Sequence, residues 1–305
     1  MIPRRAVLAA AAALVVPGCA PRVDEPAMDE MRSRAWPTTG GSAAGGRAAL
    51  DLRGDRVFVA VAINGVRTVA ILDSAAELTV LDRSFAASLH LGEGTAVTAR
   101  GTGTATAAAT VVAGVALTVA GRTLRPANVA VIDLRDVAAR IGAGRIDVIL
   151  GRDLFDAGVV ALDLASGALQ IVGGDAAHPG VAVPLTARRG IETMPVTIEG
   201  IAAIADFDLG NGGTVLIGAA FARRHRLLNG RATGVIPGGG IGGATEQTTF
   251  TLASLDLAGH RFVDVPVAID ASPTAADANI GVRLLRRFGI VTDFPGRQVW
   301  LDWRG

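Results

Sequence analysis

Apolar residues recur along most of the chain in runs of five to eight, separated by short polar turns. From about residue 51 to residue 305 these turns contain Asn-Gly, Pro-Gly or Ser-Gly pairs or single glycines. Short apolar runs between such turn residues are typical of β-strands, whereas amphipathic helices repeat their apolar positions every three to four residues over longer segments. The pattern therefore predicts an all-β protein with only a few short helices.

This strand pattern occurs twice, in the same order. Residues 57–73 align with residues 192–208 at an offset of 135, so that Asp73 falls opposite Asp208. The other aligned segments, at offsets of 130 to 138, are 115–133 with 252–270, 148–151 with 278–281, and the closing hairpins around Asp163 and Asp293. Offsets that drift by only a few residues indicate an internal duplication rather than a chance likeness between strands.

The duplication predicts two lobes, at residues 51–175 and 183–305, joined by a stretch rich in Gly, Ala and Pro. Each lobe begins with a hairpin whose turn is Asn64-Gly65 in the first copy and Glu199-Gly200 in the second. A short helix is expected after Asp82, which is suited to cap its N-terminus. The two copies are therefore expected to share one fold.

The segment before the first lobe has the features of an export signal. Two arginines precede an apolar stretch that is too short to span a bilayer and is followed by Cys19. Residues 1–19 are a predicted signal peptide, of secretory or twin-arginine type, and residues 20–50 a flexible tether. The layout resembles a lipoprotein signal with a lipidated Cys19; plain cleavage is the alternative. We expect an exported protein, in the periplasm or on the outer face of the cell envelope, held at the membrane by this lipid.

Composition narrows the classes of function. Hydrophobic residues make up 50% of the chain, which is ample for a core, and the formal net charge of +1 gives no support for a nucleic-acid partner. The four histidines are scattered without the spacing of a metal site, so no metal is expected. The single cysteine excludes an intrachain disulfide.

Each lobe places an aspartate directly after an apolar strand, within Asp73-Ser74-Ala75 and Asp208-Leu209-Gly210. This arrangement resembles the aspartic proteases, which place Asp-Thr/Ser-Gly after an apolar strand, followed by a flap hairpin and an apolar-apolar-Gly element such as Ile149-Leu150-Gly151. From about residue 50 to 305 the chain resembles two fused lobes of the retroviral type. The resemblance implies two β-barrel-like lobes of acid-protease type around a pseudo-two-fold axis, in a chain that works as a monomer.

The resemblance also implies the chemistry. In this family two carboxylates about 3 Å apart share one proton, so that one can take a proton from water while the other polarises the peptide carbonyl. By this likeness Asp73 and Asp208 are the catalytic pair, the substrate is a peptide or protein, and no cofactor is needed. A second equivalent pair, Asp163 and Asp293, lies where the family has a structural aspartate.

Further roles follow from the same resemblance. The residues expected to support the dyad are Ser74, Ala75, Gly210 and Asn211. Glu77 lies where retroviral proteases hold the substrate backbone, although an ordinary surface glutamate is an equal alternative. The Gly-rich stretches 101–110 and 234–244 are flap candidates, because glycine lets a lid move. The expected substrate-binding residues are Glu77, Gly101, Gly103, Gly239 and Gly240.

Two substitutions depart from the family pattern. Ala75 replaces a glycine, which requires a negative φ at that position. Leu209 replaces the Thr or Ser whose hydroxyl crosses between the lobes in the family, and leucine cannot form that hydrogen bond. Two hypotheses therefore stand: an endopeptidase of the cell envelope, or a catalytically inactive, protease-like lipoprotein that binds peptides.

Overall fold

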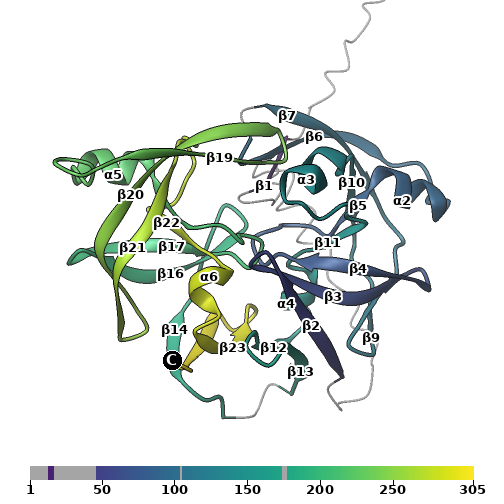
Figure 1. The fold of residues 1–305 in the computed structure, drawn as a ribbon. Helices are drawn as coiled ribbons and strands as arrows, with labels where there is room; N and C mark the ends of the chain where they lie inside the picture. Colours follow the sequence, from purple (N-terminus) through teal and green to yellow (C-terminus); the bar gives the residue numbers. More distant parts are fainter. Residues whose placement is uncertain (1–12, 17–45, 104, 174–176) are drawn as a thin grey trace, which may run out of the picture.

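The computed structural model describes the backbone of residues 13–16 and residues 46–103, 105–173 and 177–305. Figure 1 shows strands throughout, with a few short helices at their ends, which confirms the predicted all-β class. Cys19 and most of the predicted signal peptide and tether lie outside the described residues. Within the described part, no helix is long and apolar enough to cross a membrane.

The first lobe contains most of the larger of two sheets. Its strands are β2 (Arg47–Arg53), β3 (Arg56–Ile63), β4 (Val66–Leu72), β5 (Val80–Asp82), β6 (Thr95–Gly101), β7 (Thr106–Val112), β8 (Leu117–Val119), β9 (Arg122–Leu124), β10 (Val129–Ile132), β11 (Val148–Leu150), β12 (Val159–Asp163) and β13 (Ala168–Val172). Its helices are α2 (Arg83–Ser88), α3 (Arg135–Arg140) and α4 (Asp153–Asp156). Strand β1 (Ala13–Val16) pairs in parallel with β6.

The second lobe repeats this order. Its strands are β14 (Val181–Pro184), β15 (Thr186–Arg188), β16 (Ile191–Ile198), β17 (Ile201–Phe207), β18 (Val215–Gly218), β19 (Gly234–Gly240), β20 (Gly243–Leu257), β21 (His260–Asp270), β22 (Ala278–Ile280), β23 (Phe288–Asp293) and β24 (Gln298–Trp303). Its helices are α5 (Ala219–Arg224) and α6 (Val282–Leu285). Helix α3 has no counterpart here, and the sequence pattern did not predict it.

The local signals in the sequence act as expected. Asn64 and Gly65 both have positive φ, at 47° and 84°, which is the geometry that a two-residue hairpin requires. Glu199 and Gly200 adopt the same geometry in the second lobe, at 51° and 81°. The carboxylate of Asp82 accepts hydrogen bonds from two backbone N–H groups in the first turn of α2 and so caps this helix.

The boundary of the first lobe lies earlier than the sequence suggested. Residues 47–50 were assigned to the tether, but they form the first half of β2, which pairs with β3 and β13. Alternate side chains of β2 turn inward: Ala48 and Leu52 are half-buried and Leu50 is buried. This alternation has the two-residue period of a strand. In the sequence it gives only a weak hydrophobic signal, because the side chains at its start are small.

A shared layer joins the lobes at the bottom of Figure 1, where the strands run in the order β2, β13, β12, β23, β24, β14. At its centre β12 pairs with β23, with Val160 opposite Thr292 and Leu162 opposite Ile290. Because equivalent residues differ by 130, an exchange of the two copies turns each of these pairs into the other. The pseudo-two-fold axis therefore passes between β12 and β23.

Candidate active site

The two predicted aspartates occupy equivalent places. Asp73 follows β4 and donates its backbone N–H to Leu150 of β11; Asp208 follows β17 and donates to Ile280 of β22. In each lobe the aspartate strand and its partner run parallel. Both side chains are completely buried. The two lobes thus deliver one carboxylate each by the same backbone construction.

Ser74 links the two aspartate loops. Its hydroxyl donates to the carbonyl of Phe207, at 2.9 Å, and accepts from the backbone N–H of Leu209, also at 2.9 Å. The equivalent residue in the second lobe is Leu209, which has no hydroxyl to return the link. The lobes are therefore joined beside the dyad by a buried bridge that comes from one side only.

Gly210 shows how closely the lobes meet. A methyl group built on its Cα would lie 2.3 Å from Cγ of Asp73 and 2.4 Å from its Oδ2, far inside van der Waals contact. The N–H of the same glycine donates to Asp208, at 2.9 Å. Gly210 therefore lies between the two carboxyl groups. Its counterpart Ala75 is buried and is not among the residues with positive φ. The backbone at this position can therefore carry the methyl group of alanine without strain.

The two carboxylates differ in their hydrogen bonds. Oδ1 of Asp73 accepts from the N–H groups of Ala75 and Ala76, as Oδ1 of Asp208 does from Gly210 and Asn211. Among the described residues, a side chain donates to the second oxygen of one carboxylate and not of the other: the amide of Asn279 donates to Oδ2 of Asp208, at 2.7 Å.

Oδ2 of Asp73 is buried and has no hydrogen-bond partner within the described part of the chain. Since N–H donors favour the charged form of a carboxylate, the charge of the pair is better stabilised on Asp208.

Asn279 is held in place by Asn211. The Nδ2 group of Asn211 donates to Oδ1 of Asn279, at 2.8 Å, and the Oδ1 atom of Asn211 accepts from the N–H of Gly213. Position 279 corresponds to Ile149 in the first lobe, so the amide is present in one copy only. The sequence showed this as a single polar residue in an apolar element, but its contact with Asp208 became clear only from the fold.

The surroundings of Asp73 favour its protonated form. Burial raises the pKa of Asp73 well above its usual range, and the charge of Asp208 raises it further. The N–H groups of Ala75 and Ala76 and the Arg56 guanidinium lower this pKa, each with a smaller effect than burial. Asp73 is therefore suited to carry the proton of the pair.

The two Gly-rich stretches form hairpins whose tips meet above the site. Hairpin β6–β7 contains Gly101 and Gly103, and hairpin β19–β20 contains Gly239 and Gly240 (Figure 1). The N–H of Gly103 donates to Ile241, at 3.1 Å, and the N–H of Ala105 to Gly242, at 2.9 Å.

These close contacts depend on glycine, because a methyl group at position 103 would lie 2.1 Å from the backbone of Gly242. Ile241, at the tip of the second hairpin, is buried in the apolar cluster of the first lobe. The hairpins thus have the position of a closed pair of flaps.

A cavity of about 340 Å³ lies beneath these hairpins. The residues that form its wall include Arg56, Thr102, Arg140, Asn211, Ile236 and Gly239. They come from both hairpins, from the start of β3, from α3 and from the loop that follows Asp208, so the cavity lies on the side of that loop, although neither aspartate forms part of its wall. It can hold part of an extended peptide.

Glu77 does not line this cavity. It is buried, and it lies so close to Gly190 of the second lobe that a methyl group there would be 2.0 Å from Oε1 of Glu77. The surface alternative for Glu77 is therefore wrong. Its role in substrate binding stays a prediction.

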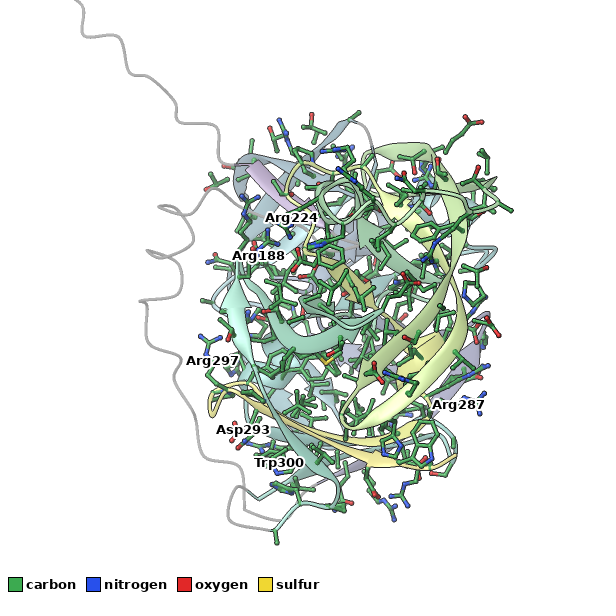
Figure 2. All side chains as sticks on the ribbon, turned by 90° about the vertical axis from the view of Figure 1, so that its left-hand side faces the viewer. Arg188, Arg224, Arg287, Asp293, Arg297 and Trp300 are labelled. Atoms are coloured by element: carbon green, nitrogen blue, oxygen red, sulfur yellow. The ribbon has the colours of Figure 1, made fainter. Side chains whose placement is uncertain are left out.

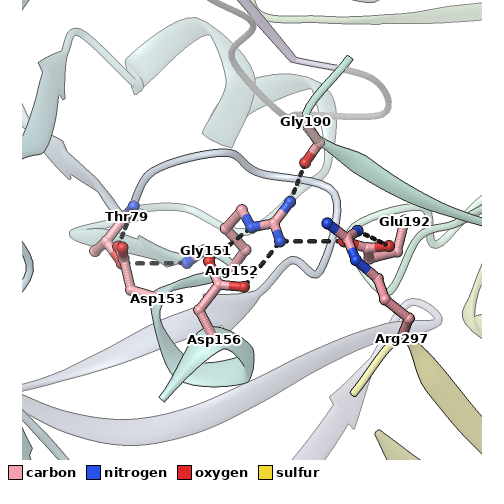
Figure 3. A network of polar contacts seen from close by, with 8 residues as sticks. All are labelled: Thr79, Gly151, Arg152, Asp153, Asp156, Gly190, Glu192 and Arg297. Carbon is pink, nitrogen blue, oxygen red and sulfur yellow. Dashed lines mark hydrogen bonds and ion pairs between the residues drawn. The ribbon is translucent and has the colours of Figure 1, made fainter. Parts of the chain in front are cut away.

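An ion network beside Glu77 fastens the lobes together (Figure 3). Arg152 of the first lobe donates to the carbonyl of Gly190, to Asp156 and to Oε1 of Glu192, the last at 3.1 Å. Arg297 donates to both oxygens of Glu192, at 2.6 and 2.8 Å. Because Glu192 is fully buried, its charge depends on these two arginines.

Asp163 and Asp293 have structural positions. Oδ1 of Asp163 accepts from the N–H groups of Ala165 and Ser166, and Oδ1 of Asp293 accepts from that of Gly296. Each carboxylate thus closes the turn of its own hairpin. Figure 2 shows Asp293 in the lower half of the molecule, whereas the flap hairpins lie at the top of Figure 1.

The comparison with known proteins agrees with this site. Residues 59–154 match the family model described as aspartyl protease. The matched segment runs from β3 to α4, includes Asp73 and Gly151, and supports a function of the protease type. No curated protein matches the chain. The match ends before the second lobe, which has the strands equivalent to those of the first.

Proposed function

We propose that this chain is an aspartic endopeptidase of the cell envelope, in which Asp73 and Asp208 together activate the water that hydrolyses a peptide bond. The supporting observation is their placement: each lobe delivers one buried aspartate from an equivalent strand, and Gly210 lies between the two carboxyl groups. A pair of carboxylates in such a site can hold one proton and one negative charge, as hydrolysis requires.

The hydrogen bonds support a proposal for the two roles. Asp208 is the base, because Asn279 and two backbone N–H groups stabilise its charge. Asp73 carries the proton and donates it to the carbonyl oxygen as water adds to the carbonyl carbon and loses its own proton to Asp208. The C–N bond of the tetrahedral diol then breaks as the proton on Asp208 passes to the leaving nitrogen and one diol O–H returns its proton to Asp73, which gives an amine, a carboxylic acid and the starting protonation of the pair.

The location is part of the same proposal. The predicted signal peptide would direct export, and a lipid on Cys19 of the mature chain would hold the two lobes at the outer face of a membrane. The segment at residues 20–46 would connect the lipid to the first lobe. A protease anchored in this way meets exported proteins as substrates. Mass spectrometry of the purified mature chain tests the anchor, because a diacylated Cys19 has a distinctive mass.

The enzymatic proposal is tested with the full chain and a library of unstructured peptides. Wild type is expected to cleave a subset of the library, while Asp73→Asn and Asp208→Asn remain folded and lose at least about a thousandfold in kcat/KM. Asp163→Asn is the matched control and should retain activity, because this carboxylate only closes a turn. Full activity in either dyad variant would contradict the assignment.

One observation favours the second candidate, a protein that binds peptides without cleaving them. Leu209 leaves the lobes joined beside the dyad from the Ser74 side only, so the two carboxylates are held less firmly than by two such bridges. This candidate predicts that wild type binds peptides of the library and releases them intact. Restoring the second hydroxyl with Leu209→Thr would then be the variant to assay for a gain of cleavage.

A further inference from the structure

Arg56 is a charged residue in the cavity that the proposed chemistry does not use. It begins strand β3, is half-buried and forms part of the cavity wall. Its guanidinium lies against the loop that follows Asp208, since a methyl group on Gly212 would be 2.8 Å from Nη1 of Arg56. It is also close enough to Asp73 to act on the charge of this carboxyl group. The charge of Arg56 therefore lies at the wall of the cavity, near the dyad.

The internal repeat explains why the described part of the chain places no ion-pair partner opposite Arg56. At the offset of 135, Arg56 corresponds to Ile191 and Gly212 corresponds to Glu77. Glu77 of the first lobe lies beside Gly190, next to Ile191, just as Gly212 of the second lobe lies beside Arg56. The first lobe carries both the base, Arg56, and the acid, Glu77, whereas the second lobe carries neither, so each of the two faces an uncharged residue across the pseudo-axis.

Within the described part of the chain Arg56 therefore forms no ion pair, because Gly212, which lies opposite it, has no carboxylate. Other arginines at the lobe contact are neutralised: Arg152 and Arg297 by Glu192, and Arg140 by Asp136, at 2.6 Å. Arg140 also donates to the carbonyl of Gly240 in the flap, at 2.7 Å, which holds its side chain against the hairpin.

Among the described residues that form the cavity wall there is no acid to pair with Arg56. A half-buried guanidinium beside a site for peptides is a strong receptor for a carboxylate, which it can bind through two parallel hydrogen bonds. The half of the cleft next to Gly212 is thus suited to an acidic side chain and unsuited to a lysine or arginine.

We propose that Arg56 determines specificity by binding the side-chain carboxylate of an aspartate or glutamate in the peptide that occupies the cleft. The inference deepens the proposed function, on which it rests, and it names the substrate class as acidic peptides. A carboxylate of the bound peptide would supply the acid that Gly212, opposite Arg56, does not provide.

The test uses pairs of peptides that differ only by Glu against Gln at one position near the scissile bond, at a pH where glutamate is ionised. Wild type is expected to cleave the Glu member of one pair roughly tenfold or more faster in kcat/KM, as a charged hydrogen bond in a partly buried site allows. Arg56→Gln should bring this ratio close to one, and Arg56→Lys should retain part of it. Arg67→Gln, which removes an exposed arginine from the neighbouring strand β4, is the matched control and should leave the ratio unchanged.

Three results would overturn the inference: no preference for Glu in wild type, a preference that survives Arg56→Gln, or an equal loss for both peptides of the pair. The last of these would mean that Arg56 acts on the dyad rather than on the substrate. If wild type cleaves nothing, the same pairs are titrated as ligands. Tighter binding of the Glu peptide that Arg56→Gln abolishes would support the role of Arg56 while the proposed enzymatic function fails; equal binding would refute both.

Discussion

Asn279 donates a 2.7 Å hydrogen bond to Oδ2 of Asp208, while the equivalent position of the first lobe holds Ile149 beside no such contact. Two lobes of one duplicated fold therefore present two carboxylates with different surroundings. In a symmetric pair the shared proton can lie on either side. Here the donor from Asn279 favours the charge on Asp208 and leaves the proton to Asp73.

Removing this donor should change the pH dependence of catalysis. In Asn279→Ala the ionised form of the pair loses a charged hydrogen bond, so the acidic limb of the kcat/KM profile should move upward by about one pH unit. The pH profile of peptide cleavage measures this shift. Ile149→Ala, at the equivalent site, is the control: it should cost stability by creating a cavity and leave the acidic limb where it is. An unchanged profile in Asn279→Ala would mean that the proton is placed by something else.

Gly210 should tolerate no side chain. In Gly210→Ala the added methyl group would lie 2.3 to 2.6 Å from three atoms of the Asp73 carboxyl group, so this group or the loop must move. A displacement of this size between the reacting groups should lower kcat/KM at least about a hundredfold. Steady-state kinetics, with circular dichroism to verify folding, provide the measurement.

The matched variant for Gly210→Ala is Ala75→Gly, at the equivalent position of the first lobe. It removes a buried methyl group, with an expected loss of about 1 kcal/mol in the free energy of unfolding, and should remain active because it introduces no contact. Normal activity in Gly210→Ala would show that the loop accommodates the methyl group without displacing the Asp73 carboxyl group.

The ion network at the lobe contact should be essential for stability. Glu192→Gln removes the buried negative charge that pairs with Arg152 and Arg297. Loss of one partner of a buried ion pair typically costs about 3 to 5 kcal/mol in the free energy of unfolding. Chemical denaturation measures this loss as a lower free energy of unfolding. Glu93→Gln, at an exposed glutamate, is the control and should change the free energy by less than about 0.5 kcal/mol. Equal stability of the two variants would show that the lobes hold together without Glu192.

Much of the site could be predicted from sequence because its parts are local. Asp73 and Asp208 follow apolar strands in two copies of one pattern, and the tips of the flap hairpins are glycines at positions where only glycine fits. Hairpin turns and the cap at Asp82 depend on neighbouring residues and were predicted for the same reason.

The remaining features depend on contacts between distant segments. Asn279 meets Asp208 across 71 residues of sequence, and Arg56 faces Gly212 only after the two lobes have come together. Helix α3 is a single short element with an apolar face of Val137 and Ala138, too few positions to establish a helical period. Residues 47–50, the first half of β2, were assigned to the tether because Ala48 and Ala49 give only a weak hydrophobic signal.

Asp153 should make stability depend on pH. It is the first residue of α4, is buried and accepts a hydrogen bond from the backbone N–H of Thr79, at 2.7 Å (Figure 3). Burial raises the pKa of Asp153 from 3.8 to about 6. An acid whose pKa is higher in the folded state favours folding while it is protonated and loses this contribution as pH rises through the folded pKa. Wild type should therefore lose roughly 3 kcal/mol between about pH 4 and pH 7 relative to Asp153→Asn, which keeps an oxygen for Thr79 but does not titrate. Urea denaturation of both proteins across this range measures the difference, and two parallel stability curves would show that Asp153 stays ionised in the folded protein.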